Sequence, residues 1–294
     1  MLEGLNKTDQ AHGLRTLKKR RPVKVIAVSG GKGGVGKTNV CANLAVAMAA
    51  LGRKVMVLDA DMGLANIDVI YGLQPRATLA DVVRGECMLD EVVLEGPLGV
   101  KVVPGASGLT EMAQLGNQSL AGIIHSFSDF HDDLDVLLID TAPGITPDVL
   151  QFTQAAHEVM VVVRDEPTSI TDAYAVIKVL SGDRDVNRFR VITNMTRGSG
   201  DGVALYNKLS RVTDRFLNVS LHHTGSIPYD ERVGRAVQMQ TPFMTAYPAS
   251  MAALSVRKLA ERADGWEVPQ QARGSIEFFL ERLVGLDAPA LQAG

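Results

Sequence analysis

Short apolar runs, rich in β-branched residues, alternate along the chain with segments of helical length. The runs are nearly continuous in hydrophobic character, which is typical of strands covered on both faces of a sheet. The predicted strands are residues 23–29, 54–59, 100–105, 135–140, 158–163, 189–194 and 219–228. The segments of helical length include residues 38–51, 119–130, 169–180 and 203–216. This alternation predicts an α/β fold with a doubly wound, mostly parallel sheet.

We expect one domain over residues 22–264, flanked by two appendages. Residues 1–21 form a polar and basic arm, and the stretch RTLKKRRPVK at 15–24 concentrates its cations. Residues 265–294 begin with a linker that contains Pro269 and Gly274. The segment SIEFFLERLVGL and a tail of small residues follow it. Since no run approaches the ~18 apolar residues of a membrane span, we predict a cytoplasmic body with at most peripheral membrane contact.

Composition narrows the function classes. The formal net charge of the 294 residues is −3, which argues against broad nucleic-acid binding. Cys41 and Cys87 fit neither a disulfide framework nor a paired metal-ligand spacing, and this usage suits a reducing cytosol.

The stretch GGKGGVGKT at residues 30–38 carries the most specific chemistry in the chain. Gly31, Gly36, Lys37 and Thr38 satisfy G-x-x-x-x-G-K-[ST] between a predicted strand and a predicted helix, as a phosphate-binding loop requires. Backbone N–H groups and the helix N-terminus would surround phosphate oxygens. Lys37 is expected to neutralise the β and γ phosphates, and the Thr38 hydroxyl to bind Mg²⁺.

Carboxylates follow two other predicted strands. Asp140 ends DVLLID, where a Mg²⁺-holding carboxylate belongs, and Gly144 shortly after it would let the segment respond to the γ-phosphate. Asp59 and Asp61 follow another strand, in LDADMGLANID. One could orient the attacking water and the other approach the metal, and the pattern alone does not assign the two roles.

At this point the chain resembles the MinD/ParA ATPases. GGKGGVGKT has their deviant Walker A pattern K-G-G-x-G-K-T, and DTAPG, ITNM and IPYD fall where that family has its switch II and adenine-contacting segments. The resemblance implies ATP, ADP and Mg²⁺ as ligands and slow ATP hydrolysis by a dimer. It also implies that the extra lysine, Lys32, crosses to the phosphates of the partner subunit, so that nucleotide state sets oligomeric state.

The resemblance assigns further roles residue by residue. Asp61 matches the water-orienting aspartate, Asn194 matches the adenine-binding asparagine, and Glu166 and Asp172 fall at the dimer interface. The expected catalytic residues are Lys32, Lys37 and Asp61, and the expected metal ligands are Thr38, Asp59 and Asp140. The expected nucleotide-binding residues are Gly31, Lys32, Gly33, Gly34, Val35, Gly36, Lys37, Thr38, Asn39, Glu166, Asn194, Ile227, Pro228 and Tyr229.

The N-terminal arm resembles one branch of that family. TDQAHGLRTL at residues 8–17 is similar to the D-Q-A-x-x-L-R element of the FlhG branch, also called FleN, whose members regulate flagellar number. The resemblance implies a signal-recognition-type GTPase partner, FlhF, contacted by Asp9, Gln10, Leu14 and Arg15. It also implies a transcriptional activator of the FleQ/FlrA type and, as additional partners, C-ring proteins.

The C-terminal segment is amphipathic at ~100° per residue. Its apolar face holds Ile276, Phe279, Leu280, Leu283 and Val284, together with Leu286. One interpretation is a reversible membrane anchor on the inner face of the cell membrane, exposed in the ATP-bound dimer, and the other is packing on its own domain. We favour the anchor, although the sparse basic residues of this segment predict weak attraction to anionic lipid.

Three other functions share the motif. A MinD-type regulator of the division site would have no use for the N-terminal arm. A ParA-type DNA-segregation ATPase would need a basic stripe on its dimer. An iron–sulfur reductase of the nitrogenase type would need two cysteines bridging a dimer, and Cys41 lies in a helical pattern that suits this badly.

Overall fold

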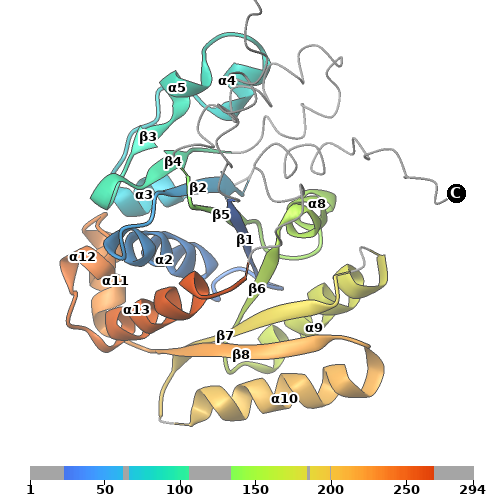
Figure 1. The fold of residues 1–294 in the computed structure, drawn as a ribbon. Coiled ribbons are helices and arrows are strands. Elements are labelled where there is room, and N and C mark those ends of the chain that lie inside the picture. Colours follow the sequence, from blue (N-terminus) through green and yellow to red (C-terminus); the bar gives the residue numbers. More distant parts are fainter. Residues whose placement is uncertain (1–22, 62–65, 106–133, 184–185, 199, 268–294) are drawn as a thin grey trace, which may run out of the picture.

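The computed structural model describes residues 23–61, 66–105, 134–183, 186–198 and 200–267 (Figure 1). The predicted helix at 119–130, the N-terminal arm and the C-terminal amphipathic segment lie outside the described residues. Within them, no helix has both the length and the apolar character required to cross a membrane.

The strands form a sheet in the order β3-β4-β2-β5-β1-β6-β7-β8, and every pairing is parallel except that of β3 with β4. The prediction of a doubly wound, mostly parallel sheet is therefore confirmed. The two-residue β3 was not predicted, because an edge strand this short leaves no hydrophobic pattern. The strands are β1 (Lys24–Ser29), β2 (Val55–Ala60), β3 (Leu94–Glu95), β4 (Lys101–Val103), β5 (Val136–Thr141), β6 (Glu158–Val163), β7 (Arg188–Thr196) and β8 (Ser220–Pro228).

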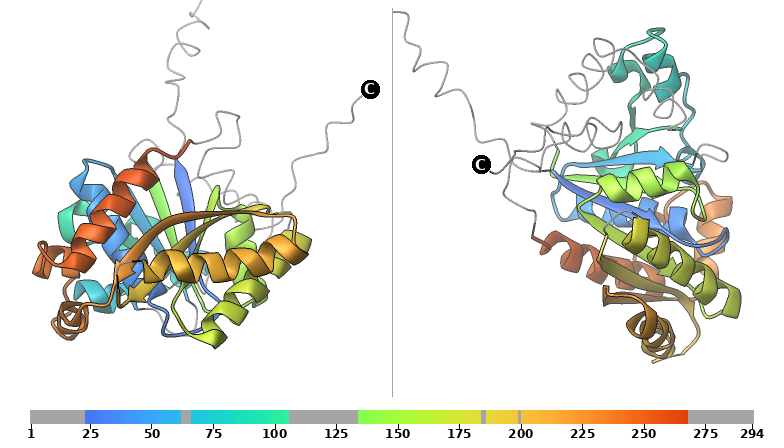
Figure 2. Two further views of the ribbon diagram at one scale, coloured as in Figure 1. Left: turned by 90° about the horizontal axis from the view of Figure 1, so that it is seen from below. Right: turned by 90° about the vertical axis from the view of Figure 1, so that its right-hand side faces the viewer.

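Helices cover both faces of the sheet (Figures 1 and 2). One face packs against α2 and α13, with α3, α11 and α12 beside them, and the other packs against α4, α5, α8, α9 and α10. The helices are α2 (Lys37–Ala50), α3 (Ile67–Tyr71), α4 (Leu79–Val83), α5 (Leu89–Val92), α8 (Pro147–Ala155), α9 (Pro167–Asp183), α10 (Asp201–Phe216), α11 (Glu231–Gln238), α12 (Phe243–Ala246) and α13 (Met251–Asp264), with the 3₁₀ turn η1 (Pro97–Gly99).

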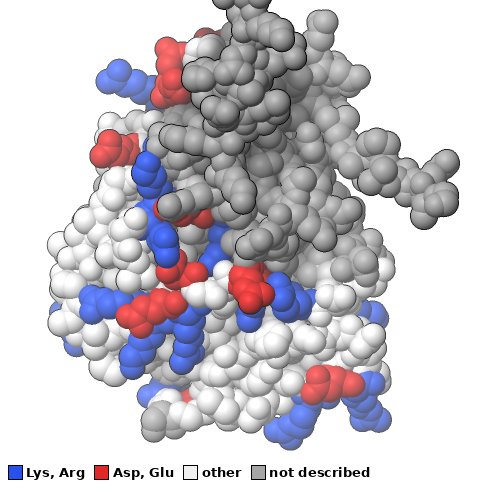
Figure 3. All heavy atoms as spheres, in the orientation of Figure 1, with Lys and Arg blue, Asp and Glu red and all other residues white. Residues whose placement is uncertain are grey.

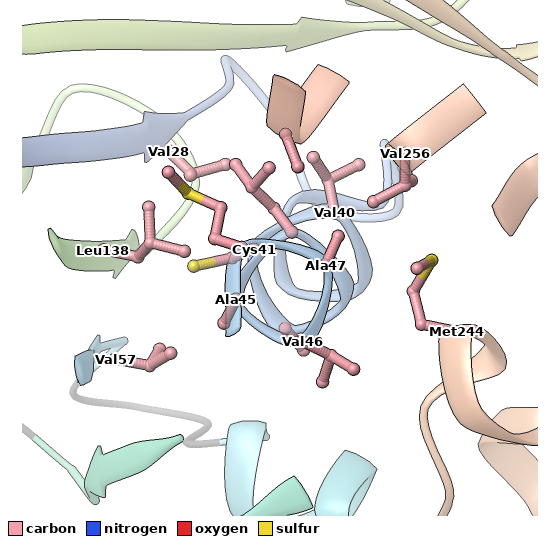
Figure 4. Packing of buried hydrophobic residues seen from close by; sticks show 14 of the residues in the cluster. Val28, Val40, Cys41, Ala45, Val46, Ala47, Val57, Leu138, Met244 and Val256 are labelled. Carbon is pink, nitrogen blue, oxygen red and sulfur yellow. The ribbon is translucent and has the colours of Figure 1, made fainter. Parts of the chain in front are cut away.

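Helix α2 is the central element of one layer. It is apolar all round, and ten of its residues are buried between the sheet and α13. In Figure 4, Val40 and Val46 lie on different sides of the helix, while Val57 and Leu138 approach from strands and Val256 from α13. A helix enclosed in this way is fixed in position, which holds its N-terminus at the end of β1.

The register of the central strands decides which side chains meet at the carboxyl edge. Asp59 of β2 lies opposite Asp140 of β5, and Asp140 lies opposite Val28 of β1. Ligands of open parallel sheets bind outside this edge. The loops after β1, β2 and β5 therefore converge on one place.

Candidate nucleotide-binding site

The loop between β1 and α2 has the geometry of an anion site. Gly34 and Gly36 have φ angles of 79° and 92°, which an L side chain rarely adopts. Gly36 occupies the N-cap of α2 and offers no side chain to the N–H groups of the first turn. These donors, together with the helix dipole, favour an anion such as phosphate.

Lys37 begins α2 and is only 6% exposed. Burial lowers the pKa of its ammonium, and the charges of Asp140 and Asp61 partly oppose that shift. A desolvated cation at a helix N-terminus is stabilised by an anionic ligand. Lys37 is therefore placed to hold phosphate at the mouth of the loop.

Asp140 has the chemistry of a metal ligand. Its carboxylate accepts a hydrogen bond from the Thr38 hydroxyl, while its Oδ1 atom and the Ser29 hydroxyl at the end of β1 are buried without a hydrogen-bond partner among the described residues. Burial, followed by the nearby charge of Asp59, raises the pKa of Asp140 to about 8. A buried, unsatisfied carboxylate beside a hydroxyl fits a hard divalent cation such as Mg²⁺.

Asp59, unlike Asp140, accepts hydrogen bonds from three backbone N–H groups. Its Oδ1 accepts the N–H of Asp61 at 3.1 Å, and its Oδ2 accepts those of Asn66 and Ile67 at 2.9 and 3.1 Å. Burial raises the pKa of this carboxyl, and the three backbone hydrogen bonds oppose the shift. Asp59 thus fixes both Asp61 and the start of α3. Its assignment as a metal ligand stays a prediction.

Asp61 is half-buried just beyond β2, and its charge acts on both Lys37 and Asp140. The segment after β5 also reaches the phosphate loop, since the N–H of Gly144 donates to the carbonyl of Gly30 at 3.1 Å. Gly144 has a φ angle of 95°. The segment predicted to respond to the γ-phosphate therefore lies against the loop.

The Lys32 side chain forms hydrogen bonds within its own subunit. Its Nζ is 2.5 Å from Glu166 Oε2 and 2.9 Å from Thr168 Oγ1, and Arg164 Nη2 is 3.0 Å from Glu166 Oε1. The hydrogen bond from Lys32 is the main reason that the pKa of Glu166 is lowered. The structure thus brings together two residues that were predicted separately for the dimer interface.

Gly31 is the point of closest approach between the loop and α9. A Cβ atom there would overlap the backbone of Asp172. This contact sets the position of the loop relative to the helix that carries Asp172. The predicted interface role of Asp172 stays a prediction.

A cavity of about 510 Å³ lies beside the loop, where a base would sit. Asn194 of β7 is 6% exposed, and its side-chain amide donates to the carbonyl of Val35 at 2.8 Å and accepts the N–H of Met195 at 2.9 Å. The cavity is lined by Gly36, Asn39, Val40, Asn194, Met195, Ile227, Pro228, Tyr229, Asp230, Glu231, Val233, Gly234, Val237, Gln238 and Phe243.

Six residues predicted for the nucleotide therefore line one cavity: Gly36, Asn39, Asn194, Ile227, Pro228 and Tyr229. The contribution of α11 and Phe243 to this cavity was not predicted from the sequence. The helical pattern directly after IPYD was the available signal, because a helix that follows the last strand must cover the carboxyl edge beside it.

Other predicted residues lie elsewhere. Gly33 and Gly34 are exposed at the tip of the loop and Val35 is buried beneath it. The predicted partner-binding residues Asp9, Gln10, Leu14 and Arg15 and the predicted membrane-helix residues Ile276, Phe279, Leu280, Leu283 and Val284 are outside the described residues.

The two cysteines lie on opposite faces of the sheet. Cys41 is fully buried in α2, where burial raises the pKa of its thiol well above the ordinary value, and Cys87 packs beside α4 and α5. A thiol enclosed within its own subunit cannot bridge to another one. This geometry argues against an iron–sulfur cluster shared through Cys41.

Comparison with known proteins agrees with the geometry. A family model described as "ParA: NUBPL iron-transfer P-loop NTPase" matches residues 22–263. The antiactivator FleN of Pseudomonas aeruginosa is 56% identical over 90% of this chain and 94% of its own length. The flagellum site-determining protein YlxH of Helicobacter pylori is 33% identical over 88% of this chain and 87% of its own.

Among solved structures, the septum site-determining protein MinD of Pyrococcus horikoshii, determined with Mg-ADP, superimposes with a TM-score of 0.64 at 26% identity. That match covers 83% of this chain and 96% of the MinD chain. Three observations indicate the same family: the phosphate loop with its second lysine, the buried Asp140, and the similarity to FleN. The chain belongs to the ParA/MinD family of P-loop NTPases, in its FleN (FlhG) branch.

Proposed function

We propose that the chain is an ATP-dependent dimerising switch that regulates the number and placement of flagella. The observation that carries the proposal is Lys32, the second lysine of a phosphate loop in a chain 56% identical to FleN over most of its length. Lys37 alone would bind nucleotide. Lys32 supplies a charge that a second subunit can use.

Within one subunit, different residues contact the phosphates, the adenine, the metal ion and the attacking water. Lys37 and the N-terminus of α2 hold the phosphates, and Asn194 with the cavity beside it holds the adenine. Thr38 and Asp140 would hold Mg²⁺, which neutralises developing charge on the phosphates. Asp61, positioned by Asp59, orients the water that attacks the γ-phosphate, and hydrolysis is slow until the dimer forms.

Dimerisation requires Lys32 to leave Glu166. The two side chains are 30% and 35% exposed, and a solvent-screened pair of this kind contributes little to stability. A charge-assisted contact with phosphate inside a closed interface is stronger than the exposed pair. ATP in the partner subunit therefore draws Lys32 out, and the released Glu166 reaches the nucleotide of the partner.

The switched surfaces act on other proteins and on the membrane. Asp9, Gln10, Leu14 and Arg15 contact the FlhF-type GTPase, and the ATP-bound dimer restrains a flagellar activator of the FleQ/FlrA type. C-ring proteins are further partners. In the dimer, the apolar face of residues 276–284 anchors the chain reversibly to the inner membrane surface, and no sequence-specific contact with nucleic acid is required.

Sizing the protein by light scattering without nucleotide, with ADP and with ATP tests this mechanism. We expect monomers in the first two states and dimers with ATP, with Asp61→Ala remaining dimeric and Lys32→Ala remaining monomeric. Lys178→Ala, which changes an exposed lysine of α9, is the control and should behave like the parent. If Lys32→Ala or Asp61→Ala cycles like the parent, the mechanism is wrong.

The division-site alternative differs in its use of the arm. Deleting residues 1–20 and measuring stimulation of an FlhF-type GTPase separates the two functions. Loss of stimulation with ATP-dependent dimerisation intact supports flagellar regulation. If deletion changes nothing, the chain acts as a MinD-type regulator instead.

A further inference from the structure

The connection between β6 and α9 is short and charged, and its backbone is tied down. It consists of residues 164–166, RDE in the sequence. The N–H of Arg164 donates to the buried hydroxyl of Ser169 at 3.1 Å, and the N–H of Ile170 donates to the carbonyl of Glu166 at 3.1 Å. Both ends of the connection are therefore held by the first turn of α9, and the side chains of Arg164 and Glu166 start from fixed positions.

The carboxylate of Glu166 lies between two cations. Lys32 Nζ contacts its Oε2 atom at 2.5 Å, and Arg164 Nη2 contacts its Oε1 atom at 3.0 Å. The hydrogen bond from Lys32 lowers the pKa of this carboxyl, and the charge of Arg164 adds to the effect. Arg164 Nη1 also lies 3.4 Å from the carbonyl oxygen of Gly34, at the tip of the phosphate loop. One negative charge is thus shared by two positive charges from different segments of the chain.

This cluster differs from a structural one in its exposure. Glu158 also meets two cations, both arginines of β7, but its side chain is only 2% exposed. The side chains of Lys32, Arg164 and Glu166 are 30%, 34% and 35% exposed. On the face shown in Figure 3, cations and carboxylates of the described residues likewise interleave at the surface. Exposed pairs exchange partners at little cost, whereas a buried carboxylate loses a partner only with a large penalty. Glu166 can therefore give up one cation while the domain stays folded.

Arg164 weakens the hold of Glu166 on Lys32 in the single subunit. The ammonium and guanidinium groups lie at 2.5 and 3.0 Å from one carboxylate, and like charges so close together repel. Lys32 therefore leaves a carboxylate that already has another partner. The neighbouring carboxylate of Asp165 has a cation of its own, since it contacts Lys208 of α10 at 2.9 Å.

The same arginine has a second effect once two copies have closed. In the dimer of the proposed function, Lys32 contacts the phosphates of the partner, and Glu166 stays in the interface that contains them. An unpaired carboxylate enclosed near phosphate opposes closure, because a charge that loses water needs a partner. Arg164 remains beside Glu166, since its backbone is fixed at the end of β6. Both effects act in the same direction and favour the closed dimer.

We propose that Arg164 is a positioning residue of the dimer switch, which keeps the Glu166 carboxylate neutralised when Lys32 moves to the phosphates of a second copy of this chain. The proposal rests on the ATP-dependent dimerisation of the proposed function and adds a residue to it. Arg164 acts through Glu166 and does not itself contact the nucleotide. Removing its charge therefore weakens the dimer only while residue 166 is a carboxylate.

A double-mutant cycle of Arg164→Gln and Glu166→Gln tests this role on the full chain. Every protein in the experiment carries Asp61→Ala to block hydrolysis, and sedimentation velocity with ATP and Mg²⁺ measures the Kd of the dimer. Lys208→Gln is the matched control, because it removes one positive charge from the pair with the neighbouring Asp165. Arg164→Lys keeps the charge and removes the planar guanidinium. Binding of a fluorescent ADP analogue, which does not require the dimer, measures the nucleotide site separately.

We expect Arg164→Gln to raise the Kd of the dimer at least ~5-fold, within the range of coupling between directly interacting residues. The same change in the Glu166→Gln background should alter the Kd by less than ~2-fold, because no carboxylate is left to neutralise. Arg164→Lys and Lys208→Gln should each stay within ~2-fold of the parent. The affinity for the ADP analogue should be equal in all these proteins.

Several results would overturn the role of Arg164. An equal loss in the Glu166→Gln background would assign Arg164 to the phosphates of the partner directly. An equal loss in Lys208→Gln would indicate an effect of net charge alone. An equal loss in Arg164→Lys would assign the effect to the shape of the guanidinium and not to its charge. Weaker binding of the ADP analogue by Arg164→Gln would assign the arginine to the loop of its own subunit, through the carbonyl of Gly34.

The parent protein tests the proposed switch in the same experiment. A parent that stays monomeric with ATP refutes the switch, and the role of Arg164 with it. A parent that dimerises with the same Kd as Arg164→Gln refutes the role of Arg164 alone and leaves the switch intact.

Discussion

Replacing Asp140 by Asn should stabilise the protein in the absence of nucleotide. The carboxylate is fully buried beside Asp59, and the pKa of Asp140 is raised from 3.8 to about 8. At pH 7 the folded chain therefore holds a proton that the unfolded chain has released. Because the folded state binds more protons, its stability falls as the pH rises from 3.8 towards 8. Asparagine does not ionise in this pH range, so the substitution removes the fall in folding stability that Asp140 causes.

The size of the effect follows from the same values. Each pH unit between 3.8 and 7 costs about 1.4 kcal/mol, so the full loss at pH 7 is about 4 kcal/mol. We expect Asp140→Asn to gain on the order of 2–4 kcal/mol at pH 7, since burying an amide whose oxygen lacks a partner offsets part of the full value. At pH 5 the gain should shrink to about 1–2 kcal/mol.

Urea denaturation of the nucleotide-free protein at both pH values measures this difference. Asp214→Asn, which changes an exposed carboxylate of α10, should show no gain at either pH. With saturating ATP and Mg²⁺ the order should reverse, because the parent gains ligand-binding free energy that the variant lacks. If Asp140→Asn is no more stable than the parent at pH 7, or if its gain is equal at both pH values, the assignment of a destabilised carboxylate is refuted.

Three other changes test separate parts of the structure. Lys32→Ala should weaken the ATP-bound dimer by about 2–3 kcal/mol per lysine, measured by the concentration dependence of light scattering, while binding of a fluorescent ATP analogue to the monomer persists. Gly31→Ala should lower the stability by about 1–3 kcal/mol in thermal denaturation, because the added methyl meets the backbone of Asp172. Glu158→Gln should cost about 3–5 kcal/mol in the same assay, since it leaves two arginines of β7 without their buried carboxylate. Glu231→Gln at an exposed position is the control for the last change, and an equal loss there would contradict the role of burial.

Much of the fold could be predicted because its strands are buried on both faces. Continuous apolar runs marked seven of the eight strands to within two residues at each end. The two-residue β3 and the short helices α3, α4 and α5 could not be predicted, because each is shorter than the window over which periodicity can be detected. Their positions depend on contacts between distant segments.

The part of the candidate site that could be predicted is the part formed by one continuous stretch of sequence. The loop at 30–38 follows a strand, so its role could be inferred from the residues themselves. The close contact of Gly31 with Asp172 and the pairing of Lys32 with Glu166 could not be inferred in this way, because β6 and α9 bring those residues from more than a hundred positions away. The hydrogen bonds that Asp59 accepts from the backbone N–H groups of Asp61, Asn66 and Ile67 could not be predicted either. Every residue except proline has such an N–H group, so the sequence does not indicate which of them bind a given carboxylate.

Asn194 links the two halves of the nucleotide site through a single side chain. Its amide holds the carbonyl of Val35 in the phosphate loop, and the same side chain lines the cavity for the base. Inorganic phosphate or pyrophosphate can occupy the loop without touching that cavity. A complete adenine nucleotide bound as we propose would contact both parts together, and Asn194 would connect the cavity to the loop that carries Lys32. Such a link would let the loop respond to an adenine nucleotide differently from free phosphate or pyrophosphate.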